Sequence, residues 1–454
     1  MKRIQFKQWL LLLCIFIAGK LNAQNPIIQT IYTADPAPMV YNDTVYLYTG
    51  HDEDKSTWFT MKDWRCYTTT DMVNWTDHGS PLSLKNFSWA KKDAWAGQCI
   101  YRKGKFYWYV PMNHQTMGMS IGVAISTSPY GPFEDALGKP LLHSGNGDID
   151  PTVFIDDNGQ AYLYWGNPYL KYVKLNEDMI SYSGDIITVP LNAEGFSKRI
   201  KDADKRPSEY EEGPWLYKRK GQYYLAYPAG GVPEHLAYST GPTPTGPWKY
   251  RDTIMPVIKK GGAFTNHPGI IDYKGRSYLF YHNGALPGGG GFTRSVCVEE
   301  FTYNADGSIP RIAATSGILN SHQNLNPFKR VEAETIAWQE GIETAGDNES
   351  GIYATAIDNN DYIKVRSVDF GKGAKNFEAN LAALTDGGTI EIHLDSLEGS
   401  LVGSLHVKAT GSLINWQLQT CQVKNIKGKH DVFFVFHGTE SNLFNFNSWQ
   451  FGKK

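Results

Sequence analysis

The sequence predicts an all-β protein: a five-bladed β-propeller followed by a β-sandwich (jelly-roll) domain. Three observations lead to this prediction: a strand pair that recurs five times, an abundance of aromatic residues and glycine, and a change of sequence texture near residue 318. The chain has 454 residues, 13% of them aromatic and 45 of them glycine. Strand-favouring aromatics combined with turn-forming glycines are typical of all-β proteins. A chain of this length exceeds one ordinary core, so we expect at least two domains.

The recurring unit is a short apolar strand, a tight turn and an aromatic-rich second strand. It reads DPAPMVYNDTVYLYTGH from Asp35, AWAGQCIYRKGKFYWYVP from Ala94, DIDPTVFIDDNGQAYLYWG from Asp148, EEGPWLYKRKGQYYLAYPAGG from Glu211 and NHPGIIDYKGRSYLFYHNG from Asn266. Each turn contains Gly, Asn or Asp, which tolerate the positive φ of tight hairpins. Weaker outer strand pairs lie between these segments, and four strands repeated five times describe a propeller. The alternative, a tandem of β-sandwiches, leaves the likeness among the five hairpins unexplained.

The sequence predicts four segments. They are a signal peptide (1–23), a propeller (24–318), a polar linker (319–328) and a β-sandwich (329–454). After the linker, short alternating runs separated by Gly-containing turns favour the sandwich.

The first segment has the pattern of a secretory signal. Lys2 and Arg3 precede the apolar run 9–18, and Ala23 offers a small residue for cleavage. We therefore expect a secreted or periplasmic protein with no membrane attachment after cleavage. An uncleaved anchor is the alternative, but the apolar run is short for a bilayer. A lipoprotein through Cys14 is disfavoured because Leu13 stands where a small residue is wanted.

Charge and cysteine content exclude some classes of function. The formal net charge is −2, which gives no reason to expect nucleic acid as a partner. The cysteines that remain after cleavage form no CxxC pair or cluster, so no zinc site is indicated and no disulfide pairing can be assigned. These cysteines are Cys66, Cys99, Cys297 and Cys421.

Three acids occupy equivalent positions at the start of the inner strand in different repeats. They are Asp35, Asp150 and Glu212, while the second and fifth repeats have Trp95 and Asn266-His267 there. Equivalent positions of propeller blades meet at one end of the central channel, so we expect the three acids to converge.

Converging acids suit hydrolysis of an acetal. Like charges held together in a shielded site separate their pKa values, so that one carboxyl serves as acid and another as base. Cleaving a glycosidic bond needs such a pair. The alternative is that each acid only caps a turn, which does not explain three in register.

The same segments resemble glycoside hydrolase family 43. The likeness rests on DPAP at Asp35, DIDPTVFID around Asp150 and EEGPWLYK around Glu212, and covers residues 27–316. It implies that Asp35 is the general base, Glu212 (rather than Glu211) the general acid, and Asp150 (rather than Asp148) the residue that raises the pKa of the acid and orients it. The family inverts the anomeric centre, which requires base and acid carboxyls about 6.5–9.5 Å apart.

Further positions are predicted to bind substrate or metal. Trp95 is expected to stack on a sugar, Arg294 after the glycine run 288–291 to contact substrate, and Phe264 to line the pocket. The alternatives are a core tryptophan and an exposed loop. His267 matches a residue with which family members hold a hydrated calcium ion in the channel, although a lone histidine is more often an ordinary hydrogen-bonding residue.

The C-terminal segment resembles carbohydrate-binding module family 6. The likeness rests on VEAET at Val331, NNDYIKVRSVDFG at Asn359 and HDVFFVFHG at His430. It implies a structural calcium ion near Glu332 or Glu334, whose hard oxygens suit that ion, and sugar contacts at Tyr362 and Asn445. The usual second aromatic is not evident, since Trp416 better matches a core position. Weak sugar binding and a bracing role therefore both stay open.

Together these features predict an enzyme that releases α-L-arabinofuranosyl or β-D-xylosyl residues from plant hemicellulose such as arabinoxylan. No cofactor is required for such chemistry. The alternatives are a β-xylosidase, an endo-arabinanase of the same family and a non-catalytic glycan-binding propeller.

Overall fold

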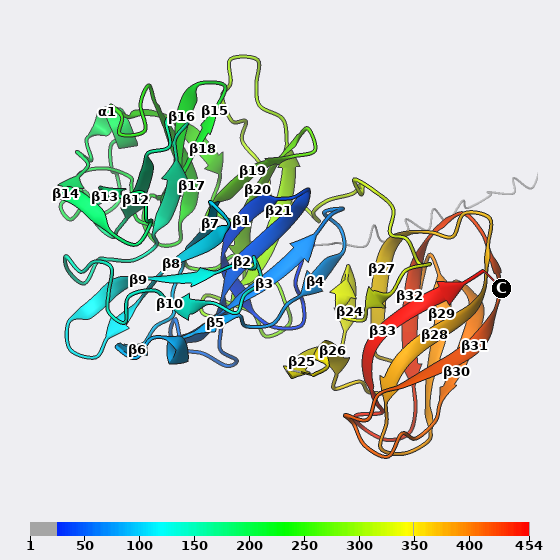
Figure 1. Ribbon diagram of the computed structural model, residues 1–454. Coiled ribbons are helices and arrows are strands. Elements are labelled where there is room, and N and C mark those ends of the chain that lie inside the picture. Colours follow the sequence, from blue (N-terminus) through cyan, green and yellow to red (C-terminus); the bar gives the residue numbers. More distant parts are fainter. Residues whose placement is uncertain (1–24, 348, 454) are drawn as a thin grey trace, which may run out of the picture.

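The protein consists of a propeller and a sandwich, as the sequence predicts (Figure 1). The computed structural model describes residues 25–347 and 349–453, so the predicted signal peptide lies outside the described residues. Helix is confined there to α1 (Ala193–Phe196) and the 3₁₀ turn η1 (Leu84–Asn86). No helix of the described part is long and apolar enough to cross a bilayer.

The first two blades are antiparallel sheets built around the first two repeats. Blade 1 contains β1 (Thr33–Tyr41), β2 (Thr44–Asp52), β3 (Met61–Thr69), β4 (Trp75–Asp77) and β5 (Leu82–Ser83). Blade 2 contains β6 (Ala90–Lys92), β7 (Gln98–Arg102), β8 (Lys105–His114), β9 (Gly118–Ser126) and β10 (Glu134–Asp135).

Blades 3 and 4 have four strands each, and blade 5 has three. Blade 3 contains β11 (Thr152–Ile155), β12 (Ala161–Trp165), β13 (Lys171–Leu175) and β14 (Tyr182–Thr188). Blade 4 contains β15 (Trp215–Arg219), β16 (Gln222–Ala229), β17 (His235–Gly241) and β18 (Lys249–Met255). Blade 5 contains β19 (Gly269–Tyr273), β20 (Arg276–Asn283) and β21 (Ser295–Phe301).

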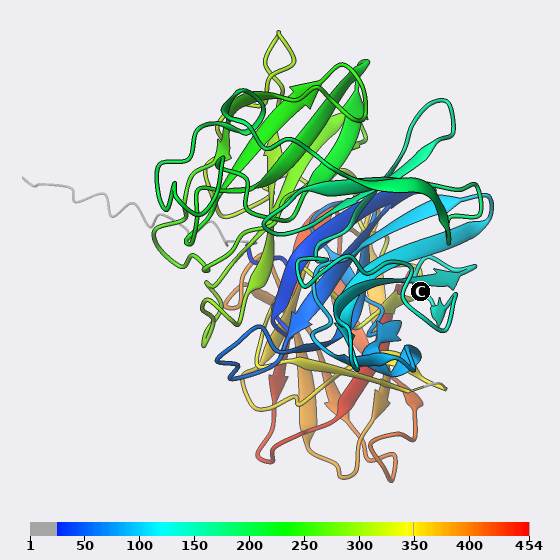
Figure 2. The same cartoon turned by 90° about the vertical axis from the view of Figure 1, so that its left-hand side faces the viewer.

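The inner strands form a closed ring. Strands β1, β7, β11, β15 and β19 each contact the next, and β19 contacts β1 again, so the blue first blade lies beside both the cyan second and the yellow-green last blade (Figures 1 and 2). Hydrogen bonds join neighbouring blades: Thr152 Oγ1 donates to Gln98 Oε1, and the Trp215 indole donates to the Ile270 carbonyl. The residues that precede these five inner strands are far apart in sequence, and the ring brings them together at one end.

The N-terminal segment closes the ring on its outer side. Ile27 N donates to the Val296 carbonyl and Val298 N donates to Asn25 Oδ1, so residues 25–27 run beside β21. Blade 5 thereby gains cover for its outermost strand, whose backbone groups otherwise remain unpaired.

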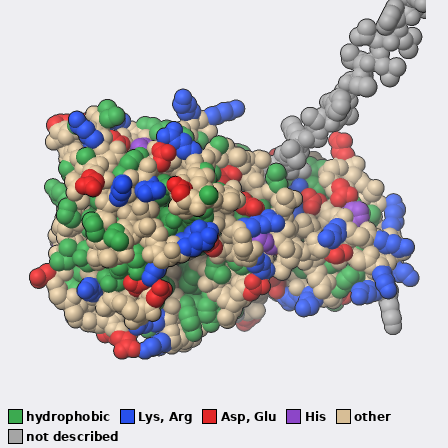
Figure 3. Space-filling model, turned by 90° about the horizontal axis from the view of Figure 1, so that it is seen from above, with side chains coloured by type: hydrophobic (Ala, Val, Ile, Leu, Met, Phe, Trp, Pro, Cys, Tyr) green, Lys and Arg blue, Asp and Glu red, His purple; other side chains and the backbone are tan. Residues whose placement is uncertain are grey.

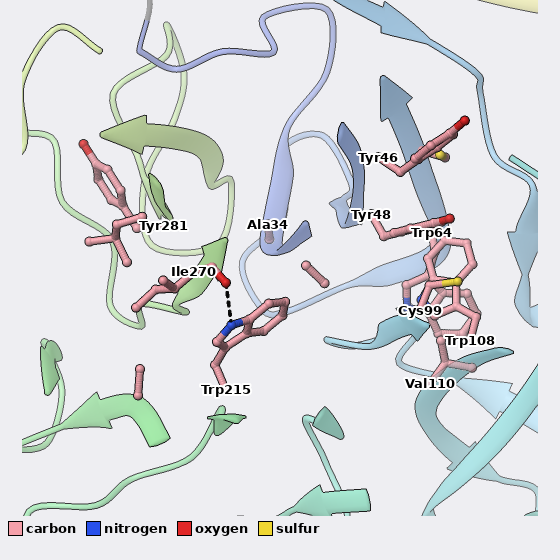
Figure 4. Packing of buried hydrophobic residues seen from close by; sticks show 14 of the residues in the cluster. Ala34, Tyr46, Tyr48, Trp64, Cys99, Trp108, Val110, Trp215, Ile270 and Tyr281 are labelled. Carbon is pink, nitrogen blue, oxygen red and sulfur yellow. Dashed lines mark hydrogen bonds between the residues drawn. The ribbon is translucent and has the colours of Figure 1, made fainter. Parts of the chain in front are cut away.

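Large aromatic side chains fill the space between blades. Trp64 and Trp108 lie 6.4 Å apart between ring centroids and pack with Tyr48, Cys99 and Val110 (Figure 4). The aromatic second strand of each repeat thus forms the core between sheets. The four cysteines of the described chain are free thiols, and three of them are buried.

The C-terminal domain is a sandwich of two antiparallel sheets. One contains β24 (Trp338–Glu340), β27 (Tyr362–Asp369), β32 (Lys429–His437), β29 (Gly388–Leu394) and β30 (Ser400–Val407). The other contains β31 (Gln417–Ile426), β28 (Ala374–Ala382), β33 (Asn445–Gly452), β26 (Gly351–Thr355), β25 (Glu343–Asp347) and β22 (Val331–Glu332). Phenylalanines and Trp449 pack between the sheets, with Phe434 and Trp449 centroids 5.1 Å apart.

A short strand of the C-terminal part joins the propeller. β23 (Thr335–Ile336) pairs with β4 and extends the outer edge of blade 1. Residues 319–328 contact both domains: His322 N donates to the Asp71 carbonyl, and Leu325 bridges Val368. Seen from above, Lys, Arg, Asp and Glu side chains are interspersed over the face of the molecule in view (Figure 3).

Candidate active site

The three predicted acids line one cavity at the end of the inner strand ring. Its volume is about 210 Å³. The cavity is lined by Asp35, Trp58, Phe59, Trp95, Ile149, Asp150, Asn167, Glu212, Thr265, His267 and Arg294. The structure therefore brings together residues from all five blades. Three further predicted residues, Trp95, His267 and Arg294, line the cavity with the three carboxyls.

The backbone at these acids adopts a conformation that few residues tolerate. Asp35 has φ 53° and Asp150 has φ 56°, while Gly213, next to Glu212, has φ 51°. The register of β1 also shifts between Ala34 and Ala37, so Asp35 lies at a bulge that turns its side chain from the ladder toward the axis. Strained backbone at side chains that share a cavity is typical of functional sites.

Asp35 is held by an arginine that is itself held by a second acid. Arg294 donates from Nη1 to Asp35 Oδ1 (2.9 Å), and from Nε and Nη2 to the two oxygens of Asp52 (2.9 Å each). Burial raises the pKa of Asp35 to about 6, and the Arg294 guanidinium opposes this shift. The arginine predicted to contact substrate therefore lines the cavity with its donors directed to Asp35 and Asp52.

Glu212 and Glu211 have opposite environments. Glu212 faces the cavity and accepts a hydrogen bond from Asn167 Nδ2 (2.6 Å). Burial raises the pKa of Glu212 to about 7, while the Asn167 hydrogen bond lowers it. Glu211 lies outside the cavity lining, in ion pairs with Arg199 and, at 3.1 Å, with Arg206. Of these two neighbours, only Glu212 lines the cavity.

Asp150 is close enough to both other acids for their charges to affect its pKa. It accepts a hydrogen bond from Gly213 N (3.2 Å). Burial raises the pKa of Asp150 well above its usual value, and the charges of Glu212 and Asp35 raise it further. Asp148, by contrast, accepts hydrogen bonds from the Trp165 indole (2.8 Å) and from Lys171, which makes it a structural residue.

His267 borders the cavity next to Asp35. Its Nδ1 lies 4.0 Å from Asp35 Oδ1, and burial lowers the pKa of the imidazole to about 3, so the ring is neutral. A neutral imidazole is the form that binds a metal. Among the described residues, however, the one group of three close His, Cys, Asp or Glu ligand atoms lies elsewhere, at His51, Glu53 and Asp63.

Aromatic side chains surround the mouth of the cavity. Trp95 is fixed by donating from its indole to the Phe59 carbonyl (3.0 Å). Phe292 packs against Phe59 and Phe264 with centroids 4.8 and 5.0 Å apart. Phe264 is 45% exposed and lies on this aromatic rim, outside the cavity lining.

Several residues of the site carry no signal in the repeats. Asp52, Asn167 and Thr265 come from hairpin loops or strand ends that vary between blades. A further buried acid, Glu234, accepts a hydrogen bond from Asn266 N (2.9 Å), and burial raises its pKa well above normal. Of these residues, only Glu234 has a recognisable sequence signal. It is an acidic residue that closely follows the Gly230-Gly231 pair, at the end of a segment that is otherwise mostly apolar and aromatic.

Comparison with known proteins agrees with this geometry. Residues 23–309 match glycosyl hydrolases family 43, and residues 332–453 match carbohydrate binding module (family 6). The chain belongs to glycoside hydrolase family 43. It is a glycoside hydrolase, and the predicted resemblance is confirmed for both domains.

Relatives of this family share most of the chain. An arabinoxylan arabinofuranohydrolase from Bacillus subtilis is 35% identical, over 96% of this chain and 94% of its own length. A xylosidase/arabinosidase from Bacteroides ovatus is 32% identical, over 61% of this chain and 94% of its own. The solved structure of a family 43 arabinoxylan arabinofuranohydrolase from Bacillus subtilis, in complex with cellotetraose, has a TM-score of 0.82 at 32% identity and covers 95% of this chain and 98% of its own.

In the family 6 domain, the two predicted sugar contacts lie on different sheets. Tyr362 is on β27, whereas Asn445 is on β33 and has its amide engaged by Thr355 Oγ1 (2.7 Å) and the Leu413 carbonyl (2.8 Å). Trp416 lies in the loop before β31, half-buried, with its ring centroid 5.1 Å from that of Tyr353. The expectation that Trp416 is a core residue is therefore wrong: the core position is taken by Trp449, and Trp416 packs on Tyr353 in a loop.

The predicted metal ligands of this domain line a cavity between the domains. Its volume is about 660 Å³, and it is lined by Glu332 and Glu334 together with Asp77 and Arg65 of blade 1. The Glu332 carboxylate is paired with Arg330 (2.8 Å). Glu334 Oε2 is buried without a hydrogen-bond partner, and burial raises the pKa of this carboxyl well above normal.

Proposed function

We propose that this family 43 enzyme is an inverting hydrolase that releases α-L-arabinofuranosyl residues from arabinoxylan, with β-D-xylosyl residues as the second choice. The observation that carries the proposal is the single cavity that holds Asp35, Asp150 and Glu212. The names of the relatives, arabinoxylan arabinofuranohydrolase and xylosidase/arabinosidase, support this choice of sugars.

In the proposed reaction, Asp35 acts as base and Glu212 as acid. Asp35 Oδ1 is engaged by Arg294, which leaves Oδ2 to take a proton from water while the water oxygen bonds to the anomeric carbon. Glu212 gives its proton to the glycosidic oxygen as the bond from that oxygen to the anomeric carbon breaks. The pKa values of about 6 and about 7 allow the required combination of ionised base and protonated acid near pH 6.5. The carboxyl separation of about 6.5–9.5 Å that inversion requires stays a prediction.

The size of the cavity favours removal of one terminal or branching sugar. A volume of about 210 Å³ accommodates one pentose with little space left over. An endo-acting arabinanase needs a cleft that holds sugars on both sides of the cut bond. We therefore place that alternative below exo or debranching action.

The proposal is tested with nitrophenyl α-L-arabinofuranoside, nitrophenyl β-D-xylopyranoside and arabinoxylan. We expect release of arabinose, with the product anomer inverted in the first minutes by NMR. Glu212→Gln should lower kcat by about 10³-fold or more while the protein stays folded. Glu211→Gln is the matched control, because Glu211 is ion-paired outside the cavity. No release from any substrate favours a glycan-binding propeller, and equal losses in the two variants contradict the assignment of the acid.

We also propose two structural calcium ions. In the family 6 domain, the unpartnered buried oxygen of Glu334 supports a cation there, with Glu332 as a second ligand if it leaves Arg330. In the propeller, the neutral imidazole of His267 supports an ion whose other ligands are mostly water. Neither ion takes part in the proton transfers. A melting temperature that does not change between chelator and added calcium contradicts both sites.

We propose that the protein is exported, on the pattern of residues 1–23. Expression of the full chain should give a mature protein in the periplasm or medium, with a new N-terminus at Gln24 by mass spectrometry. Recovery of unprocessed protein in the membrane fraction contradicts this.

A further inference from the structure

We propose that Asn167, fixed by Arg206, is the positioning residue that decides which oxygen of Glu212 carries the proton. The inference rests on the proposed role of Glu212 as general acid and goes beyond it, because it assigns one oxygen of that carboxyl to the substrate and the other to the protein.

The starting observation is a chain of hydrogen bonds that ends on the acid. Arg206 donates from Nη2 to Asn167 Oδ1 (2.9 Å), and Asn167 donates from Nδ2 to Glu212 Oε2 (2.6 Å). A guanidinium has only donors, so the atom of Asn167 that faces it must be the amide oxygen. The NH₂ group of Asn167 therefore has to face Glu212, and the usual ambiguity of amide orientation is removed.

This orientation fixes the proton on the acid. In a protonated carboxyl the carbonyl oxygen is the stronger acceptor, and the hydroxyl oxygen carries the proton that is donated. Because Glu212 Oε2 accepts the short hydrogen bond from Asn167, the proton is favoured on Oε1. Oε1 is then the atom that gives its proton to the glycosidic oxygen.

The same hydrogen bond gains strength during the reaction. Once Oε1 has lost its proton, Glu212 is a carboxylate, and hydrogen bonds to an ionised acceptor are stronger than those to a neutral one. An interaction that strengthens toward the transition state accelerates the reaction instead of only binding substrate. Asn167 thus helps the acid most when the leaving group most needs a proton.

The surroundings hold both residues in place. Asn167 follows β12, and its backbone N donates to the carbonyl of Gly147, three residues before Asp150 in the segment that leads into β11. Arg206 lies in the segment before Glu211, where Nη1 donates to the Glu211 carbonyl (3.0 Å) and Nε pairs with Oε2 of that residue (3.1 Å). The acid's own chain neighbour therefore anchors the arginine that orients Asn167.

The experiment compares substrates that differ in their need for a proton. The variants are Asn167→Ala, Arg206→Ala, Arg206→Lys and Glu212→Ala, assayed on arabinoxylan and on the dinitrophenyl glycoside of the sugar that the enzyme releases. A dinitrophenolate leaves without protonation, so loss of acid catalysis does not slow it. We expect Asn167→Ala to lower kcat on arabinoxylan by about 10²-fold, within the range of general acid catalysis, and on the dinitrophenyl glycoside less than about fivefold. Arg206→Ala should also lower kcat more on arabinoxylan than on the dinitrophenyl glycoside, but by a smaller factor. Arg206→Lys should recover part of the activity on arabinoxylan that Arg206→Ala loses.

Two controls separate positioning from folding. Arg199→Ala removes the other arginine on Glu211 without touching Asn167, so any loss should be equal on both substrates. Asn167→Ala should have no further effect on arabinoxylan in the Glu212→Ala background, because a positioning residue acts only through its partner.

The outcomes distinguish this inference from the proposed function. If Asn167→Ala slows both substrates equally, or adds its full effect in the Glu212→Ala background, the inference is overturned while the wild-type activity stands. If Glu212→Ala itself shows no dependence on the leaving group, the assignment of the acid fails, and the inference fails with it.

Discussion

Carboxylates line both the active-site cavity and the cavity between the domains, and the two sets are neutralised differently. At the active-site cavity, Arg294 forms ion pairs with both Asp35 and Asp52. Between the domains, Asp77 pairs with Arg65 and Glu332 pairs with Arg330. An acid with its own arginine, such as Asp77, forms a structural ion pair. Acids that share one arginine, as Asp35 does, or that lack one, as Glu334 does, have raised pKa values.

The largest expected effect follows from removing the arginine of the catalytic cavity. Arg294→Met should lower kcat/KM by on the order of 10²–10³-fold, because Asp35 loses the contact that orients it and takes up a proton more readily. Arg294→Lys keeps the positive charge but lacks the several N–H donors of the guanidinium, so kcat/KM should fall less than in Arg294→Met. Steady-state kinetics on the preferred glycoside measure both. Since Arg294→Met also leaves Asp52 buried and unpaired, Asp52→Asn serves as a milder second variant; activity near wild type in all three contradicts the role of Arg294.

The corresponding change between the domains should affect stability and leave catalysis intact. Arg65→Met leaves Asp77 without its arginine and should reduce the free energy of unfolding by about 3 kcal/mol, the lower end for breaking a buried pair. Thermal unfolding measures this loss. The double variant Arg65→Met with Asp77→Leu should recover most of it, since an apolar pair can replace a buried ion pair. A fall in kcat without a fall in stability would show that the contrast between the two cavities is wrong.

The pH dependence of activity sharpens the comparison. Asp35 must be ionised and its pKa is raised to about 6, so kcat/KM should fall about tenfold per pH unit below that value. Glu212 must be protonated and its pKa is raised to about 7, so kcat/KM should fall similarly above that value. The profile of the free enzyme is thus a narrow bell centred between the two. A profile that is flat from pH 5 to 8 is incompatible with this assignment.

The smallest effect is expected at Glu334, a buried acid of the interdomain cavity whose Oε2 has no hydrogen-bond partner among the described residues. Its folded pKa is raised, so its contribution destabilises the protein increasingly as pH rises from the unfolded value through the folded one. In chelator at pH 8, Glu334→Gln should therefore be about 1 kcal/mol more stable than wild type. In calcium the order should reverse, because the variant loses a ligand. Identical melting temperatures under both conditions would remove Glu334 from the proposed metal site.

The fold and the three acids were predictable because the signals are local and repeated. Each hairpin has its own turn residues and alternation, and the same position in each repeat reaches the same end of the ring. Asn167 and Asp52 follow no such rule. Asn167 enters the cavity from the loop after β12, and Asp52, at the end of β2, acts behind the cavity through Arg294. The pairing of β23 with β4 was equally hidden: a two-residue strand has too little pattern to specify its partner. Trp416 was misassigned because the sequence around a tryptophan does not show whether it lies in the core, as Trp449 does, or in a loop.

The left-handed backbone at Asp35 and Asp150 restricts how this enzyme can change over generations. Apart from glycine, aspartate and asparagine are the residues that adopt such a conformation most readily. An aspartate codon becomes an asparagine codon by one nucleotide change, and the replacement keeps the shape of the side chain while removing its charge. The simplest heritable loss of hydrolysis therefore yields a descendant whose pocket still fits the sugar and no longer cuts it.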